Sequence, residues 1–219
     1  MAGKIPSSQV EVEERLAALE ALVADPGGVS NDGRLKDGQW NDLRVPFNSV
    51  KVGSTFPPTF TKWRDDGAGS TGLYGWAFSP TQLQQVFFDA QLPHTYTEGT
   101  RIAPHCHFLT ATTPTVGQTV RFGLEYTYAN VNGVFPTTTT IYAERTFTAE
   151  DVAFKQLIGG FDPDIEDEDV RVSAMFSCRF FRDADHANDT YTGSVVVFEA
   201  DFHYLVESLG SAGEFSKTD

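Results

Sequence analysis

The sequence predicts an all-β protein, an antiparallel sandwich of the jelly-roll type, with a short coiled-coil-like α-helix at its amino terminus. Aromatic residues are abundant, with 18 Phe, 7 Tyr and 3 Trp among 219 residues, a content typical of packed β-structure. About eight candidate strands occur at irregular spacing, with Thr-rich runs and almost no helical periodicity, which favours a sandwich. Three long segments alternate apolar with polar residues, as half-buried strands do: 120–129, 170–180 and 196–206.

The amino-terminal segment, residues 7–24, has helical periodicity instead. Its apolar residues are spaced by four, three and four positions, as in the a/d seam of a coiled coil about two heptads long. A helix this short is marginal in water unless its apolar stripe is buried. We therefore expect the seam to mediate trimerisation or docking, and packing of the helix on its own domain is the alternative. The seam consists of Val12, Leu16, Leu19 and Val23.

Composition divides the chain into three parts. Asp25, Pro26 and two glycines end the helix, and a polar stretch rich in turn formers follows. The predicted organisation is an oligomerisation and docking helix at 1–28, a linker at 29–39 and the β-sandwich domain at 40–219. Further strands are expected at 45–52, 73–78, 84–92, 101–113 and 137–143, and a short helix only near 82–88 or 149–157.

Charge and apolar patterning exclude several classes of partner. Sixteen Lys and Arg against 30 Asp and Glu leave a formal net charge of −14, a field that repels phosphate backbones, so we expect no nucleic-acid partner. No run approaches about 18 apolar residues, so we expect no membrane insertion, and no secretory signal is evident at the amino terminus. Cys106 and Cys178 are interpreted as buried thiols, although one disulfide would also be compatible with the sequence.

His105 and His107 form the sharpest local motif. Two histidines two residues apart on a strand place both imidazoles on one face, where they could ligate a metal ion. A cupin would supply a glutamate about four residues later, but Leu109 and its neighbours stand there. Across a threefold axis, two histidines per chain would make six ligands, enough for octahedral iron or nickel. Hydrogen-bonded structural histidines at a sheet or subunit interface are the interpretation we favour, and no cofactor is otherwise predicted.

Three other motifs have a functional and a plain structural interpretation. The glycine-rich residues 67–72 match GxGxxG literally but lack a following helix, so a surface loop is expected. The acidic segments 162–169 and 183–189 could bind calcium, but neither has EF-hand spacing and solvated loops are favoured. Glu125, Glu199 and Asp201 could form a glycosidase pair, a weak signal because every antiparallel sheet offers such pairs.

The chain resembles a group of virion proteins of tailed bacteriophages. The resemblance covers most of residues 40–217, and not the amino-terminal arm. It implies a virion setting, as a structural, head-fibre or tail-fibre component, and brings no catalytic residues. The motifs that carry it are 40–46 (WNDLRVP), 91–94 (QLPH) with 98–99 (EG), 104–108 (PHCHF), 123–129 (GLEYTYA) and 201–204 (DFHY).

From the residues and this resemblance we expect a non-enzymatic structural protein, a homotrimer on the outside of a phage particle assembled in the host cytoplasm. It would decorate the capsid as a cement protein or form a head fibre, with the major capsid protein or another virion component as its partner. A receptor-binding tail fibre or spike that attaches to a host surface glycan is the alternative. A cupin-type metalloenzyme and a polysaccharide depolymerase are the enzyme alternatives.

Overall fold

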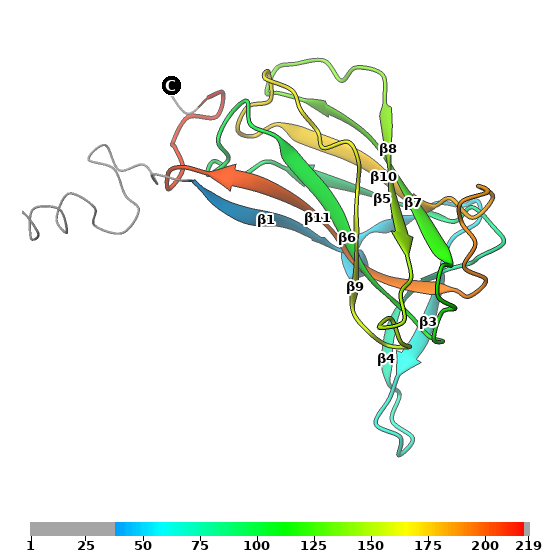
Figure 1. The fold of residues 1–219 in the computed structure, drawn as a ribbon. Helices are drawn as coiled ribbons and strands as arrows, with labels where there is room; N and C mark the ends of the chain where they lie inside the picture. The colour runs from blue at the N-terminus through cyan, green and yellow to red at the C-terminus, as the bar shows by residue number, and fades with distance from the viewer. Residues whose placement is uncertain (1–37, 217–219) are drawn as a thin grey trace, which may run out of the picture.

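A computed structural model describes residues 38–216 of the chain (Figure 1). The expected helix, with Val12, Leu16, Leu19 and Val23, lies outside the described residues, as does most of the expected linker. The described residues are nearly all β. The elements are β1 (Gln39–Pro46), a 3-10 turn η1 (Phe47–Ser49), β2 (Lys51–Val52), β3 (Thr59–Arg64), β4 (Leu73–Phe78), β5 (Gln85–Gln91), β6 (Ile102–Thr110), β7 (Thr119–Ala129), β8 (Thr139–Thr146), β9 (Leu157–Gly160), β10 (Met175–Arg182) and β11 (Val195–Val206).

The strands form two antiparallel sheets with jelly-roll topology, which confirms the predicted fold class. The first sheet has the order β3-β4-β11-β6-β9, with β1 also paired to β11, and the second has the order β2-β5-β10-β7-β8. From β4 to β11 the chain changes sheet at every connection except the hairpin between β7 and β8. This path gives the two interleaved four-stranded sheets of a jelly roll, to which β1, β2 and β3 are added at the edges.

The core lies between the sheets and is dominated by phenylalanine. On β10, Phe176, Cys178 and Phe180 point inward, as the period of two requires. Phe180 is fully buried and packs edge-on against Phe47, with 4.9 Å between the ring centroids. Cys106 and Cys178 are both buried free thiols, and burial raises the pKa of each, so the interpretation as inert core residues is confirmed.

Several predicted elements differ in extent or type. The segment 170–180 is a strand only from Met175, because the backbone of residues 170–174 turns, with a positive φ at Ser173. The region 82–88 enters strand β5 and 149–157 forms turns, so neither is the short helix considered from the sequence. Strands β1, β3 and β9 were missed wholly or in large part.

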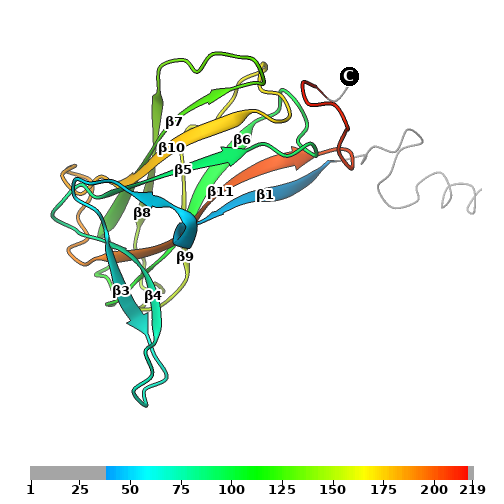
Figure 2. The same ribbon diagram turned by 180° about the vertical axis from the view of Figure 1, so that it is seen from behind.

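Strand β11 organises the first sheet. One edge pairs with β4 at Val195–Val197 and then with β1 from Glu199 onward, while the other edge pairs with β6. A bulge between Val197 and Glu199 shifts the register at the change of partner. The β3–β4 hairpin extends beyond the sandwich, whereas the start of β1 and the end of β11 lie together at the opposite end (Figures 1 and 2). Among the described residues, none lies in a helix long and apolar enough to cross a bilayer.

Candidate functional site: a histidine–aspartate cluster

A compact group of titratable side chains lies on the outer face of the first sheet. His105 and His107 on β6 point away from the core, while Cys106 between them points inward. Asp201 on β11 is the direct register partner of His105. Strand pairing therefore brings a carboxylate to the two imidazoles that the sequence had placed on one face.

Three donor atoms of this group converge on one point. The Nε2 atoms of His105 and His107 are 3.1 Å apart. The Oδ2 atom of Asp201 lies 3.4 Å from the first and 3.2 Å from the second. The three atoms make a nearly equilateral triangle, with the two rings tilted at 66° to each other. We refer to His105, His107 and Asp201 as the HHD cluster.

The HHD cluster is largely withdrawn from water. Asp201 is 2% exposed and His105 is 8% exposed, although both lie on the outer face of a sheet. The Oδ1 atom of Asp201 has no hydrogen-bond partner, which is unusual for a buried carboxylate. The hydrogen bond to Asp201 raises the pKa of His105 above its ordinary value, against the opposing effect of burial.

Neighbouring side chains outside the HHD cluster contact both imidazole rings. The side-chain amide of Gln156 lies 2.9 Å from Nδ1 of His107. On the other side, the ring of His203 contacts that of His105 at 4.5 Å between centroids, and its Nε2 is 2.5 Å from Oδ1 of Asp42. These partners come from β1, β11 and the segment before β9, so the orientation of the rings depends on contacts between several strands.

Backbone register explains why the cluster forms here. Arg44 on β1, Asp201 on β11, His105 on β6 and Gly160 on β9 are successive register partners in one row across the sheet. Gly160 ends the row without a side chain, and no atom lies within 4 Å of the position that its Cβ would take. Gly160 therefore leaves free space next to its register partner His105.

A surface hollow adjoins the HHD cluster at His107. It has a volume of about 350 Å³ and combines aromatic with polar side chains. Trp63 and Phe198 meet edge-on at 5.3 Å, and Arg64 lies over the ring of Phe154 at 4.6 Å. The residues lining the hollow are Trp63, His107, Leu109, Phe154, Gln156, Phe198 and Glu199.

The third potential metal ligand beside His105 and His107 comes from another strand, not from β6. Leu109 is buried in a small apolar group with Val196 and Ala77, so the cupin pattern of a donor four residues along is absent from this strand. The nearby carboxylate is instead Asp201, almost one hundred residues later in the sequence. Its alternation with apolar residues on β11 marked it as outward-facing, but only strand register could pair it with His105. The six-histidine arrangement across a threefold axis stays a prediction.

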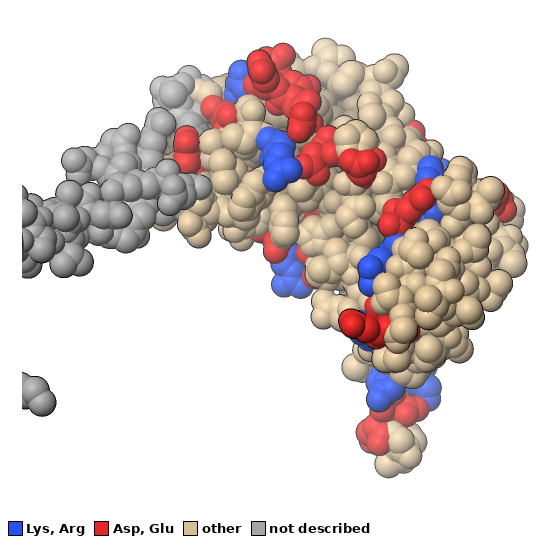
Figure 3. Space-filling view, viewed as in Figure 1, with Lys and Arg blue, Asp and Glu red and all other residues tan. Residues whose placement is uncertain are grey.

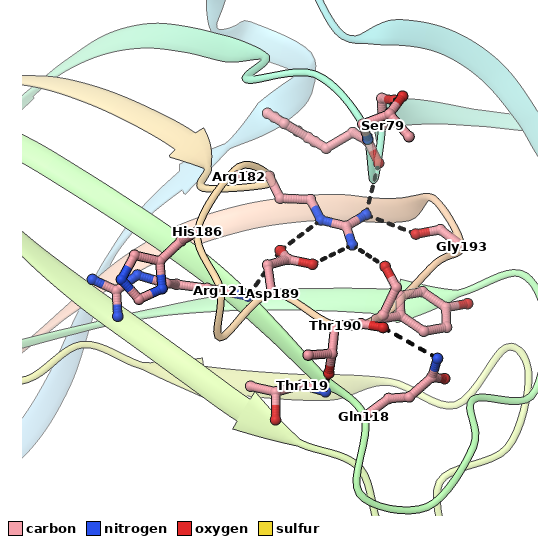
Figure 4. A network of polar contacts seen from close by, with 12 residues as sticks. Ser79, Gln118, Thr119, Arg121, Arg182, His186, Asp189, Thr190 and Gly193 are labelled. Carbon is pink, nitrogen blue, oxygen red and sulfur yellow. Dashed lines mark hydrogen bonds and ion pairs between the residues drawn. The ribbon is translucent and has the colours of Figure 1, made fainter.

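The acidic loop 183–189 uses its carboxylates internally rather than as a calcium site. Asp189 forms a fully buried ion pair with Arg182 at 2.7 Å (Figure 4). Asp183 accepts a hydrogen bond from Arg121 at 2.9 Å. The Arg182 guanidinium also donates to the carbonyl oxygen of Gly193 at 2.7 Å. These contacts anchor the loop between β10 and β11, a structural role.

Acidic and basic side chains are interspersed over the face that Figure 3 shows. In the segment 162–169, Asp164 pairs with Arg101 at 2.7 Å, and Asp167 accepts a hydrogen bond from the hydroxyl of Tyr128. The acidic segment is thus held to the sandwich through some of its carboxylates.

The remaining motifs are separated from the cluster. Glu125 lies on the outer face of the second sheet, bound to Arg179, so it cannot form a pair with Glu199 or Asp201 of the first sheet. Residues 67–72 form the exposed tip of the β3–β4 hairpin, where the Asp66 carboxylate accepts a hydrogen bond from the Ala68 backbone N–H at 2.8 Å. The expectation of a surface loop is confirmed.

Comparison with known proteins reveals only distant structural similarity. No protein-family model and no curated protein matches the chain. The chain is similar to the CBM22-1–GH10 modules of Clostridium thermocellum endo-1,4-β-D-xylanase 10B in complex with xylohexaose, at 11% identity and a TM-score of 0.35 over 75% of this chain and 28% of that chain.

Two further solved structures resemble the chain at the same level. TmCBM61 in complex with β-1,4-galactotriose matches at 13% identity and a TM-score of 0.31, over 83% of this chain and 99% of that chain. A structure of infectious bursal disease virus, Gx strain, matches at 10% identity and a TM-score of 0.29, over 82% of this chain and 53% of that chain. Similarities this distant carry no functional conclusion.

Proposed function

We propose that the protein is a non-enzymatic structural component of a bacteriophage virion, a homotrimer on the particle exterior that decorates the capsid or forms a head fibre. The observation that carries the proposal is the division of the sandwich into an apolar interior and polar outer faces. The core between the sheets is filled with apolar side chains, and the HHD cluster and the hollow both lie outside it. The hollow on this outer face is accessible to a neighbouring molecule, as adhesion requires.

The sequence resemblance to phage virion proteins supports the setting. The motifs that carry it include residues 104–108 and 201–204, which contribute the HHD cluster and its neighbour His203. In this proposal residues 1–28 trimerise the chain or dock it on the major capsid protein or another virion component. The sandwich then faces outward.

Three measurements test the proposal. Light scattering on the full chain at micromolar concentration should give three times the 24.1 kDa mass of one chain. Electron cryo-microscopy of purified particles should locate the sandwich on the outer surface, and deletion of residues 1–28 should abolish attachment to the particle while circular dichroism still reports a β fold. A monomeric full chain, or particles that retain the truncated protein, would contradict the proposal.

A receptor-binding tail fibre or spike is the second candidate, and the hollow favours it. Aromatic faces beside an amide and a carboxylate suit a ligand with both apolar and hydroxyl surfaces, such as a host surface glycan. The side chain of Phe154 is 40% exposed at the hollow. If the hollow binds glycan, Phe154→Ala should lose binding to host cells, whereas Phe135→Ala, at a comparably exposed aromatic elsewhere, should retain it. Equal binding by both variants would argue against this candidate.

The enzyme alternatives are tested directly. Purified protein, with and without added divalent metal, should release no oligosaccharide from the polysaccharide of its host. Oligosaccharide release that increases with time would contradict the structural proposal and indicate a depolymerase.

A further inference from the structure

We propose that the HHD cluster is a metal site, in which His105, His107 and Asp201 of a single chain bind one divalent transition-metal ion. The geometry fits such an ion. Donor atoms about 2.1 Å from a metal, separated by angles near 100°, lie about 3.2 Å from one another. The three separations in the cluster are 3.1, 3.2 and 3.4 Å.

The second argument is that the cluster contains a buried polar atom without a hydrogen-bond partner. The buried Asp201 carboxylate has one oxygen without a partner, and the other faces both Nε2 atoms. The two Nε2 atoms lie 3.1 Å apart, so without an ion either one N–H donates to the other nitrogen or both N–H groups turn toward the single oxygen Oδ2 of Asp201. A cation in the triangle would accept lone pairs from all three groups and offset the charge of the carboxylate.

Groups behind the imidazoles suit ligation through Nε2. His107 meets the Gln156 side-chain amide at Nδ1, and rotation of that amide by 180° would let its oxygen accept the Nδ1–H of a metal-bound imidazole. Such partners fix the tautomer of ligating histidines and orient their rings.

The donor set selects the class of ion. Two imidazoles and one carboxylate suit zinc, iron, cobalt or nickel, whereas calcium and magnesium prefer oxygen ligands. Three ligands on one side leave positions for water or for a donor from a bound molecule. The space over Gly160 and the hollow beside His107 give such a donor access.

The proposal differs from a site on a threefold axis in its stoichiometry. The donors already converge within one chain, so binding requires no second copy and the proposal does not depend on the trimer. An intrachain site binds one ion per chain, whereas a six-histidine site binds one ion per three chains. Measured stoichiometry therefore separates the two arrangements.

The test uses the untagged full chain, stripped with a chelator and titrated with Zn²⁺ in a calorimeter and with Co²⁺ in a visible spectrometer. We expect one ion per chain and a cobalt spectrum without thiolate charge transfer. His107→Gln and Asp201→Asn should each weaken Zn²⁺ binding by more than about 100-fold, because loss of a ligand exceeds the 10–100-fold effect of an outer partner. His186→Gln, on an exposed loop, is the matched control and should bind as the native chain does.

Three results would overturn the proposal. The first is a native chain that takes up neither ion at 100 µM, and the second is one ion per three chains. The third is loss of binding in His203→Gln but not in His107→Gln, which would assign the ion to Asp42, His105 and His203, a neighbouring group whose donors also converge. If Asp201→Asn fails to fold by circular dichroism, His107→Gln decides, because its side chain is 15% exposed and truncation there disturbs less of the sheet.

Discussion

The buried ion pair between Arg182 and Asp189 joins the loop before β11 to the second sheet. Both side chains are fully inaccessible to water, and without Asp189 the guanidinium would keep only carbonyl oxygens, such as those of Tyr191 and Gly193, as partners. We expect Asp189→Ala to lower the free energy of unfolding by about 3–5 kcal/mol, the usual effect of leaving a buried charge unpaired. Urea unfolding at neutral pH measures this difference in the free energy of unfolding. Asp185→Ala, at an exposed carboxylate of the same loop, should change the value by less than about 0.5 kcal/mol.

Protonation of His105 gives the metal-free chain a pH-dependent stability. The hydrogen bond to Asp201 raises the pKa of His105 in the folded state, with His107, His203 and Asp42 also nearby. A group with a raised folded pKa contributes stability fully below its unfolded pKa, about 6.5, and loses it as the pH rises through the folded pKa.

We therefore expect the urea midpoint of the chelator-stripped protein to fall as the pH rises through that interval, and His105→Gln to flatten the fall. Saturating Zn²⁺ should also flatten it, because the ion replaces the proton. A native chain and a His105→Gln variant with parallel pH profiles would show that this pair does not control the dependence.

At the level of the strands, two glycines differ in the space that surrounds the position a Cβ atom would take. A Cβ on Gly123 of β7 would stand 2.1 Å from the Phe181 ring, whereas one on Gly160 of β9 would meet nothing within 4 Å. Gly123→Ala should therefore lower the free energy of unfolding by about 1–3 kcal/mol, as overpacking does. Gly160→Ala, the matched strand glycine, should have little effect. Equal midpoints for the two variants in urea would mean that the Phe181 ring moves freely.

The strands differ in how far their sequences predicted them. β7 and β11 are long, so alternation predicted that both strands exist, and it also predicted the inward face of β7. On β11 the bulge between Val197 and Glu199 reverses the expected faces before it, because Val195 and Val197 lie in the core whereas Val196 packs with Phe198 outside it. β9 is four residues long with two glycines, and most of β1 is exposed, so neither carries a strong pattern. Alternation also misled at residues 170–174, where Val170, Val172 and Ala174 are buried by a turn instead of a strand.

The HHD cluster was likewise predictable only in the part that local strand geometry determines. The spacing of two residues on one strand predicted that His105 and His107 share a face, since local geometry determines it. Asp201 joins them through a register set by β11 and β6, a long-range pairing that a single sequence does not specify. The hollow depends on four separate segments and was not predictable for the same reason.

For the whole molecule, the described residues contain a complete jelly roll, with both sheets and their shared core inside residues 38–216. We expect a chain that begins at residue 38 to unfold cooperatively and to be monomeric by light scattering, because the seam of Val12, Leu16, Leu19 and Val23 is removed. It should still bind one Zn²⁺ per chain, and Zn²⁺ at 100 times its dissociation constant should raise its stability by about 2.7 kcal/mol. A truncated chain that folds but no longer binds metal, next to a full chain that does, would place the ion between subunits. A truncated chain that is still trimeric would show that the sandwich, and not the amino-terminal seam, mediates trimerisation.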